Sequence, residues 1–280
     1  MYNSYEKIED IVLRHSMRGM DVLRKYMKND YCKEACDMIL SWRTGTILLT
    51  TGFYVGGFAE TDGPVGTVAM ALALNKLGYH AVIVTDEYCR GYFELKGIDV
   101  EYLPIGADDA ECEAVIRKYD PVGLISIERC GSNIHGDYAN MRGISIKENT
   151  APCDRLFDMV YGTIPTIAIG DGGNEIGMGN VSELISEKLA LVPCTVKVDK
   201  LVIATVSNWG SYGIVAYMSQ ATNKKLLLSF EEILDYIEKT VEMGCVDGVT
   251  KENVVVVDGF GMDIEEEIVS ALHDTCSLMN

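Results

Sequence analysis

Positive charge is scarce in this sequence: 24 lysines and arginines stand against 42 aspartates and glutamates, which gives a formal net charge of −18. Phosphate backbones and anionic membrane surfaces repel such a chain, so we expect neither nucleic acid nor a membrane as a partner. Long apolar runs are lacking as well. None approaches the roughly 20 residues of a membrane span, and the N-terminus has no signal-peptide core. We therefore expect a cytoplasmic protein.

Paired metal-binding cysteines are also missing. The nine cysteines are scattered and form no Cys-x-x-Cys pair, and the four histidines are widely dispersed. Cys32 and Cys36 share one face of an expected helix but have no second pair of ligands, so a zinc site is disfavoured. We expect these thiols to be reduced and mostly buried as small apolar groups.

Nucleotide-binding motifs are absent too. No Gly-x-Gly-x-x-Gly follows the first expected strand, which disfavours a nicotinamide cofactor, and flavin is not expected either. The phosphate-binding Gly-x-x-x-x-Gly-Lys-Ser/Thr motif does not occur. What the chain does have is apolar bulk: at 280 residues and 48% hydrophobic it can bury a sizeable core.

Strand and helix patterns alternate through most of the chain, which predicts a doubly wound α/β fold. This succession favours a mostly parallel, Rossmann-like sheet with helices on both faces. We expect a single domain over residues 1–280, with an N-terminal helical pair in residues 1–44 that packs across the sheet or at the interface of a homo-oligomer. Arg18-Gly19 marks a kink or a break in the first helix. Strands are predicted at 46–51, 80–85, 100–104, 123–127, 163–169, 200–206 and 253–257, and helices at 6–28, 32–42, 64–78, 88–96, 109–119, 154–161, 181–191, from 207, 230–243 and 263–279.

A glycine-rich turn at residues 170–179 is central to our interpretation. A short apolar strand precedes it and delivers Asp171, Asn174 and Glu175 into the turn. Glycine in this density is typical of backbone that closely approaches a ligand or a metal. Open α/β sheets also bind their ligands at the carboxyl ends of strands. The turn therefore predicts a functional site rather than a flexible loop.

Further acidic residues follow other expected strands. Glu60 and Asp62 precede the helix at 64–78, and Glu128, Asp86 and Asp258 each come just after a strand. Carboxylates about 4 Å apart repel one another by on the order of 4 kcal/mol per pair at an effective dielectric near 20. A divalent cation with oxygen ligands, Mg²⁺, Mn²⁺ or Ca²⁺, would relieve this repulsion. The alternative for Asp62 and Asp86 is that each caps a helix.

Two polar stretches complete the expected site. The loop after the fourth predicted strand is too long for a plain connection, and its Tyr138, Asn140 and Arg142 offer donors for a carboxylate-bearing ligand. Its alternative role is a lid whose polar groups satisfy one another. Asn208 and Trp209 open a later helix, where they either cap it or form the wall of a ligand pocket.

Several of these stretches also occur together in a known family. The matching motifs, which fall within residues 45–260, are Thr51-Gly-Phe, Glu60-Thr-Asp-Gly-Pro64, Ser126-Ile-Glu-Arg129, Gly136-Asp-Tyr-Ala-Asn-Met-Arg-Gly143, Gly170-Asp-Gly-Gly-Asn-Glu-Ile-Gly-Met-Gly179 and Ser207-Asn-Trp-Gly210. In them the chain resembles the D-glutamate cyclase C-terminal domain family. The resemblance implies an α/β carbon-oxygen lyase that converts D-glutamate to 5-oxo-D-proline and water, with a divalent metal. We expect the chain to correspond to the carboxyl half of longer relatives, without their N-terminal domain.

If the chain catalyses this reaction, we hypothesise that its site residues have three roles. Glu128 takes the amine proton, and Arg142 with Asn174 or Asn208 holds the α-carboxylate. The full sets are Glu60, Asp62, Asp171 and Glu175 for Mg²⁺ or Mn²⁺, Glu128, Asp171 and Glu175 for catalysis, and Tyr138, Asn140, Arg142, Asn174, Asn208 and Trp209 for the substrate.

Two other functions remain open at this stage. A metal-dependent phosphoryl- or nucleotide-processing enzyme would also use a glycine-rich turn with carboxylates, although the missing phosphate motif counts against it. A non-catalytic module that binds an amino acid or a metal is the other alternative, and a pocket without a titrating group would favour it.

Overall fold

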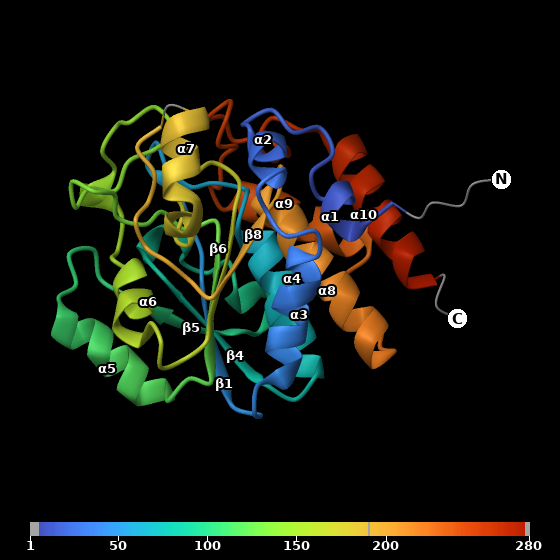
Figure 1. Cartoon of the computed structure of the whole chain (residues 1–280), viewed down its shortest axis with the longest axis horizontal. Coiled ribbons are helices and arrows are strands. Elements are labelled where there is room, and N and C mark those ends of the chain that lie inside the picture. The colour runs from blue at the N-terminus through green and yellow to red at the C-terminus, as the bar shows by residue number, and fades with distance from the viewer. Residues whose placement is uncertain (1–5, 190, 278–280) are drawn as a thin grey trace.

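The computed structural model describes residues 6–189 and 191–277, and its centre is a six-stranded, fully parallel sheet (Figure 1). The strand order is β5-β4-β1-β6-β7-β8, which is that of a doubly wound sheet, so the predicted Rossmann-like fold class is confirmed. A short antiparallel pair, β2 (Tyr54–Val55) and β3 (Phe58–Ala59), follows the first strand. The strands of the main sheet are β1 (Thr46–Thr50), β4 (His80–Thr85), β5 (Asp99–Tyr102), β6 (Gly123–Ile127), β7 (Thr166–Gly170) and β8 (Lys200–Ile203).

Helices cover both faces of the sheet. In Figure 1, α3, α4 and α8 lie on one side of the strands and α5 and α6 on the other. Helices α4 and α8 pack against each other and are buried on nearly all sides, which explains why their sequences are apolar all round rather than amphipathic. The helices are α3 (Tyr31–Ser41), α4 (Pro64–Lys76), α5 (Asp109–Tyr119), α6 (Asp154–Val160), α7 (Ser182–Lys188), α8 (Ser207–Thr222), α9 (Phe230–Glu242) and α10 (Met262–Ser277).

Strand β1 lies at the point where the direction of the chain through the sheet reverses. Leu48 pairs with Val82 of β4 on one side and with Leu124 of β6 on the other. The chain runs outward from β1 to β5 and then returns through α5 to β6. The connections that leave β1 and β6 diverge to opposite faces, and this divergence opens a crevice at their carboxyl ends.

The first predicted helix is broken, as Arg18-Gly19 indicated. Only α1 (Ile8–Ile11) and α2 (Met20–Arg24) are helical, because His15 and Gly19 take positive φ angles of 59° and 87°. The segment between them crosses the carboxyl edge of the sheet. Helix α3 packs against β8 and α8, where the Tyr31 hydroxyl donates to the Ile203 carbonyl at 2.8 Å.

Two other predicted elements are wrong. The helix expected at 88–96 is two separate 3₁₀ turns, η1 (Glu87–Cys89) and η2 (Glu94–Lys96), since Gly91 between them has a φ of 90°. The strand expected at 253–257 does not form. The amides of Val254 and Val256 bond to carbonyls within the same short segment, and no strand of the described residues pairs with it.

Among the described residues, no helix is both long enough and apolar enough to cross a bilayer.

Candidate active site

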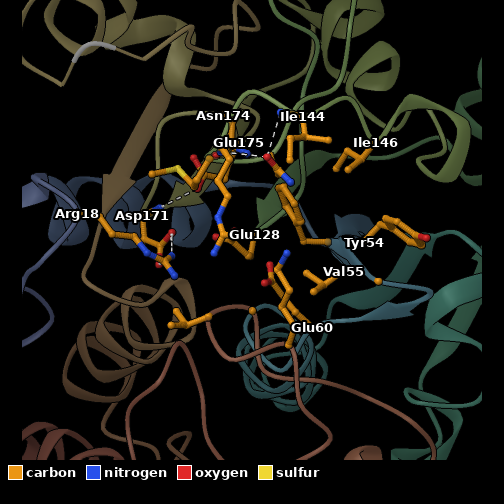
Figure 2. Close-up of a pocket in the computed structure, with 18 of the residues that line it drawn as sticks. Arg18, Tyr54, Val55, Glu60, Glu128, Ile144, Ile146, Asp171, Asn174 and Glu175 are labelled. Atoms are coloured by element: carbon orange, nitrogen blue, oxygen red, sulfur yellow. Dashed lines mark hydrogen bonds and ion pairs between the residues drawn. The ribbon is translucent and has the colours of Figure 1, made fainter.

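A cavity of about 400 Å³ opens beyond the carboxyl ends of β6 and β7 (Figure 2). Its volume is in the range of small-molecule sites. In Figure 2, Arg18 and Asp171 lie on one side of it and Tyr54 and Ile146 on the other. The charged lining residues are Glu60, Glu128, Asp171, Glu175, Arg18, Arg142 and Lys251, and the larger apolar ones are Phe53, Tyr54, Val55, Met141, Ile144, Ile146 and Val249.

The predicted glycine-rich turn after β7 wraps around its own glutamate. The Glu175 carboxylate accepts hydrogen bonds from the amides of Gly172 and Gly173, both at 2.7 Å. A Cβ on Gly172 would lie 2.8 Å from Glu175 Oε1 and 3.1 Å from Asn174 Oδ1. A side chain would therefore fill the space in front of these oxygens, which is why this position requires glycine.

Arg18 supplies a cation within hydrogen-bond distance of the buried acids. Its Nη1 donates to both Asp171 carboxylate oxygens at 2.9 Å, and its Nη2 donates to Asp258 Oδ1 at 2.7 Å. Burial alone would lower the pKa of Arg18, but the carboxylates of Asp171 and Asp258 more than offset this and raise it. The guanidinium therefore stays charged and ties the N-terminal segment to Asp171, at the end of β7, and to Asp258.

Glu128 enters the cavity from the end of β6. Its backbone is left-handed, with a φ of 46°, and its Oε2 accepts a hydrogen bond from Ser207 Oγ at 2.6 Å. Burial raises the pKa of Glu128 well above its ordinary value, and the carboxylates of Glu175 and Asp62 raise it further. A carboxyl group with a raised pKa exchanges protons closer to neutral pH, which suits general acid–base chemistry.

Glu60 lies after β3 on the opposite side of the cavity from Asn174 (Figure 2). Within the described part of the chain, no group donates a hydrogen bond to its carboxylate. Burial raises the pKa of Glu60, and Asp258 and Asp62 add to the shift because they carry the same charge. The cavity thus contains at least two carboxyl groups, Glu60 and Glu128, whose protonated forms the environment favours.

Asp62 and Asn208 cap two helices reciprocally. The Asp62 carboxylate accepts hydrogen bonds from the amides of Ser207 and Asn208 at the start of α8, both at 2.8 Å. Asn208 Oδ1 accepts from the amides of Gly63 at 3.0 Å and Gly66 at 2.8 Å at the start of α4. Neither side chain lines the cavity. Asn208 therefore supports the site from behind, contrary to the predicted substrate contact, whereas Asp62 caps α8 and also has an oxygen within 4.8 Å of ligand oxygens of Asp171 and Asp258.

Two groups of buried carboxylates are close enough to hold a metal ion. Within each group the ligand oxygens lie within 4.8 Å of one another. Asp171 belongs to both groups, whereas Glu60, which was expected as a ligand, belongs to neither. The first group is Asp62, Asp171 and Asp258, and the second is Glu128, Asp171 and Glu175.

The chemistry of these donors fits a hard divalent cation. All are oxygens, which suit Mg²⁺ or Mn²⁺ better than zinc. In addition, Asp258 Oδ2 and Asn174 Oδ1 are buried without a hydrogen-bond partner among the described residues. Such unsatisfied oxygens are costly unless they bind a ligand.

The polar loop after β6 contributes Asn140 and Arg142 to the cavity. Asn140 Oδ1 accepts from the amides of Arg142 at 2.9 Å and Ile144 at 3.1 Å, so this side chain shapes the loop itself. Asn174 Nδ2 donates to the Ala139 carbonyl at 2.8 Å and anchors the loop to the turn after β7. The Arg142 side chain is exposed and makes no ion pair with any described residue.

Two predicted aromatic contacts lie outside the cavity. The Tyr138 hydroxyl donates to Asp154 Oδ1 at 2.6 Å, and Trp209 Nε1 donates to Glu265 Oε2 at 2.6 Å. Both rings are buried. Tyr138 and Trp209 therefore reinforce the walls, contrary to the predicted contact with substrate.

Sequence reasoning missed two cations of the site. Arg18 was noted only as part of a helix break, and the signal that could have found it was a basic residue at a forced turn. Lys251 lines the same cavity from the loop before Asp258, with a φ of 62°. Nothing in the spacing of these residues along the chain indicated that they meet the strand-end acids. Asp86, by contrast, lies away from the cavity, where it pairs with the buried Arg129 at 2.6 Å.

Comparison with known proteins gives one family match. The family model described as "D-glutamate cyclase-like, C-terminal" matches residues 8–273. A curated relative, the mitochondrial D-glutamate cyclase of Homo sapiens, is 31% identical over 239 residues, which make up 75% of this chain and 38% of that protein. The chain thus spans well under half the length of that relative. A solved structure of actinorhodin polyketide ketoreductase with NADPH aligns with 84% of this chain and 92% of its own chain, at 15% identity and a TM-score of 0.31.

Proposed function

The chain belongs to the D-glutamate cyclase-like, C-terminal family, and from this premise we propose that its cavity converts D-glutamate to 5-oxo-D-proline and water. The observation that carries the proposal is the distribution of charge in the cavity. Buried carboxyl groups with raised pKa values lie beside the exposed cations Arg142 and Lys251. D-Glutamate has one ammonium group, which the acidic side chains of the cavity can bind, and two carboxylate groups, which Arg142 and Lys251 can bind.

The reaction forms one C–N bond and breaks one C–O bond. The α-nitrogen attacks the γ-carboxyl carbon, and the two protons that the ammonium loses leave with a γ-oxygen as water. No oxidant, reductant or second substrate is needed. The chemistry therefore requires a group that moves protons from nitrogen to oxygen and ends unchanged.

Glu128 is the residue we assign to this proton transfer. It lines the cavity at 4% exposure, and its raised pKa allows it both to accept a proton from the ammonium and to return it to the leaving oxygen. The hydrogen bond from Ser207 Oγ at 2.6 Å holds one carboxylate oxygen in place. The other oxygen of Glu128 is left for the substrate.

Arg142 is the proposed partner of the α-carboxylate, with Asn140 and Asn174 beside it in the cavity wall. Holding this group would bring the nitrogen within about 3 to 3.5 Å of the γ-carbon, the separation that favours attack. The apolar wall that includes Tyr54 and Ile146 would face the two methylene groups.

We assign Mg²⁺ or Mn²⁺ to the carboxylates of Asp62, Asp171 and Asp258, because this group leaves Glu128 free to exchange protons. When bound, the cation supplies positive charge that polarises the γ-carboxyl group. Asp171 lines the cavity, whereas Asp62 and Asp258 are not among its lining residues but have ligand oxygens within 4.8 Å of one on Asp171. Glu175 keeps the turn closed around its own amides and so fixes the position of Asp171.

Proton NMR of D-glutamate with the purified chain tests the proposal. We expect 5-oxoproline from the D isomer and none from L-glutamate in the presence of Mn²⁺ or Mg²⁺, with loss of product when a chelator is added. Product that persists in chelator would contradict the metal assignment but keep the reaction. Absence of product under every condition, with folded protein, would contradict the reaction itself.

A further inference from the structure

Arg18 binds the same oxygens that the proposed metal ion requires. Its guanidinium contacts both oxygens of Asp171 and Oδ1 of Asp258 at 2.7 to 2.9 Å. With Asp62, these two aspartates form the carboxylate group whose ligand atoms lie within 4.8 Å of one another. Figure 2 shows the Arg18 side chain directed at Asp171 along the cavity wall.

The guanidinium leaves part of this site unused. Asp258 is 4% exposed, and its Oδ2 is buried without a hydrogen-bond partner among the described residues. This oxygen is an acceptor with free lone pairs on one of the two carboxylates that Arg18 contacts. A cation that takes several oxygen ligands at once, as Mn²⁺ and Mg²⁺ do, would use it together with oxygens of Asp62 and Asp171.

Arg18 and a divalent cation cannot contact these oxygens at the same time without strong repulsion, because two positive charges would then lie only a few ångströms apart. The Arg18 side chain lies at the solvent-facing edge of the site, outside any helix or strand. It is 26% exposed, it follows the 75% exposed Met17, and it belongs to the non-helical segment between α1 and α2.

We propose that Arg18 and a divalent cation bind the Asp171–Asp258 pair in alternation, so that Arg18 is a built-in counter-cation that the metal must displace. This inference rests on the proposed metal-assisted function. It makes Arg18 a residue that sets metal affinity rather than one that touches substrate. Only the molecules in which Arg18 is displaced can bind the metal ion. The measured affinity for the metal is therefore lower than the affinity of those molecules alone.

Mn²⁺ titration of the full chain, followed by the electron paramagnetic resonance of free Mn²⁺, tests the alternation. Arg18→Gln should bind Mn²⁺ at least tenfold more tightly than the wild type. Lys251→Gln is the matched control, because Lys251 lines the same cavity but pairs with no carboxylate among the described residues. It should change the Kd by less than about threefold, since a charge that contacts no ligand acts only through the general field. Asp258→Asn should abolish the tightening.

A second measurement on the wild type covers the case in which Arg18→Gln fails to fold. Phenylglyoxal labels accessible arginines, and peptide mapping should show that Mn²⁺ increases labelling at Arg18 but not at Arg24. Equal Mn²⁺ affinity in Arg18→Gln, Lys251→Gln and wild type, unchanged labelling of Arg18, or no Mn²⁺ binding in any variant would each overturn the proposal. Since neither readout is turnover, a chain that binds Mn²⁺ as expected yet makes no 5-oxoproline would contradict only the proposed function.

Discussion

Replacement of Glu128 by glutamine separates the chemical role of this carboxyl group from its structural one. Glutamine has the same shape, and its amide oxygen can still accept the hydrogen bond that Ser207 Oγ donates at 2.6 Å. It can neither accept nor return a proton in the cyclisation. Because a positioned acid–base group typically contributes about 10²- to 10⁴-fold, we expect the rate of 5-oxoproline formation to fall at least about 100-fold.

The same substitution should stabilise the fold at neutral pH. Burial disfavours a charged Glu128, and because the ligand oxygens of Glu128, Asp171 and Glu175 lie within 4.8 Å of one another, each like-charge pair would add a cost on the order of 3 kcal/mol at an effective dielectric near 20. The wild type avoids this cost only by taking up a proton, which itself becomes less favourable as pH rises. Arg18 offsets part of the charge on Asp171, and backbone amides offset part of that on Glu175. We therefore expect the free energy of unfolding to rise by about 1 to 3 kcal/mol in Glu128→Gln.

The sign of the pH dependence follows from the raised pKa of Glu128. The native state holds the proton more tightly than the unfolded state, so the wild type loses stability as pH rises from about 4.3 through the native pKa. Glu128→Gln has no such proton to lose at this position. Its stability advantage in urea unfolding should be small at pH 5 and larger at pH 8.

Two results would refute this reasoning. Turnover within tenfold of the wild type would remove Glu128 as the proton carrier. A stability difference from the wild type that is the same at pH 5 and pH 8 would show that the buried carboxyl group is not held in its protonated form. Ser207→Ala, which keeps the carboxyl group but removes its hydrogen-bond donor, is the control for loss of positioning alone.

Three further changes test the surroundings of the site. Asn208→Ala leaves the amide of Gly66 without an acceptor, whereas that of Gly63 keeps Asp62 Oδ1 at 2.9 Å, and should lower the free energy of unfolding in urea by about 1 to 3 kcal/mol; a loss under about 0.5 kcal/mol would argue against the reciprocal caps. Gly172→Ala places a Cβ 2.6 Å from Met141 Sδ and 2.8 Å from Glu175 Oε1, so NMR assays should show at least about a tenfold loss of turnover, and full activity would show that the turn can relax. Burial raises the pKa of Glu265 to about 7, although the hydrogen bonds from Trp209 and Tyr212 lower it. The stability of Glu265→Gln relative to wild type should therefore increase by about 3 kcal/mol between pH 5 and pH 8, and a flat difference would contradict the burial effect.

The fold could be predicted from the sequence because its determinants are local and periodic. Buried parallel strands read as short apolar runs, such as Ile47 to Leu49 and Leu124 to Ile127, and their alternation with helices restricts the topology to few choices. The failures are local as well. The valines at 254–256 form an apolar run without a neighbouring strand to pair with, and Gly91 interrupts an apparently helical pattern. Hydrophobic periodicity indicates which residues are buried, but it does not indicate whether a neighbouring strand is available for backbone hydrogen bonds.

The candidate site was predictable only in part, for a different physical reason. Glu128, Asp171 and Glu175 come together because β6 and β7 end at the same edge of the parallel sheet, and Glu60, which follows the short strand β3, lines the same cavity. What each acid can do depends on its hydrogen-bond partners, and these come from distant parts of the chain. Asp62 caps α8 by accepting from the amide of Ser207, 145 residues away, and Asp171 pairs with Arg18, 153 residues away. No spacing rule connects such residues.

The distribution of partners divides the buried acids into two kinds. Asp62 and Glu175 accept hydrogen bonds from backbone amides, and Asp171 and Asp258 accept them from Arg18, so each of these four carboxylates has a specific amide or charged donor. Glu60 has no donor among the described residues, and Glu128 has only the neutral Ser207 hydroxyl. A buried carboxyl group without a charged or amide partner is the one whose proton is easiest to keep and to exchange. The two acids without such a donor, Glu60 and Glu128, both line the cavity, which supports the assignment of proton transfer to Glu128.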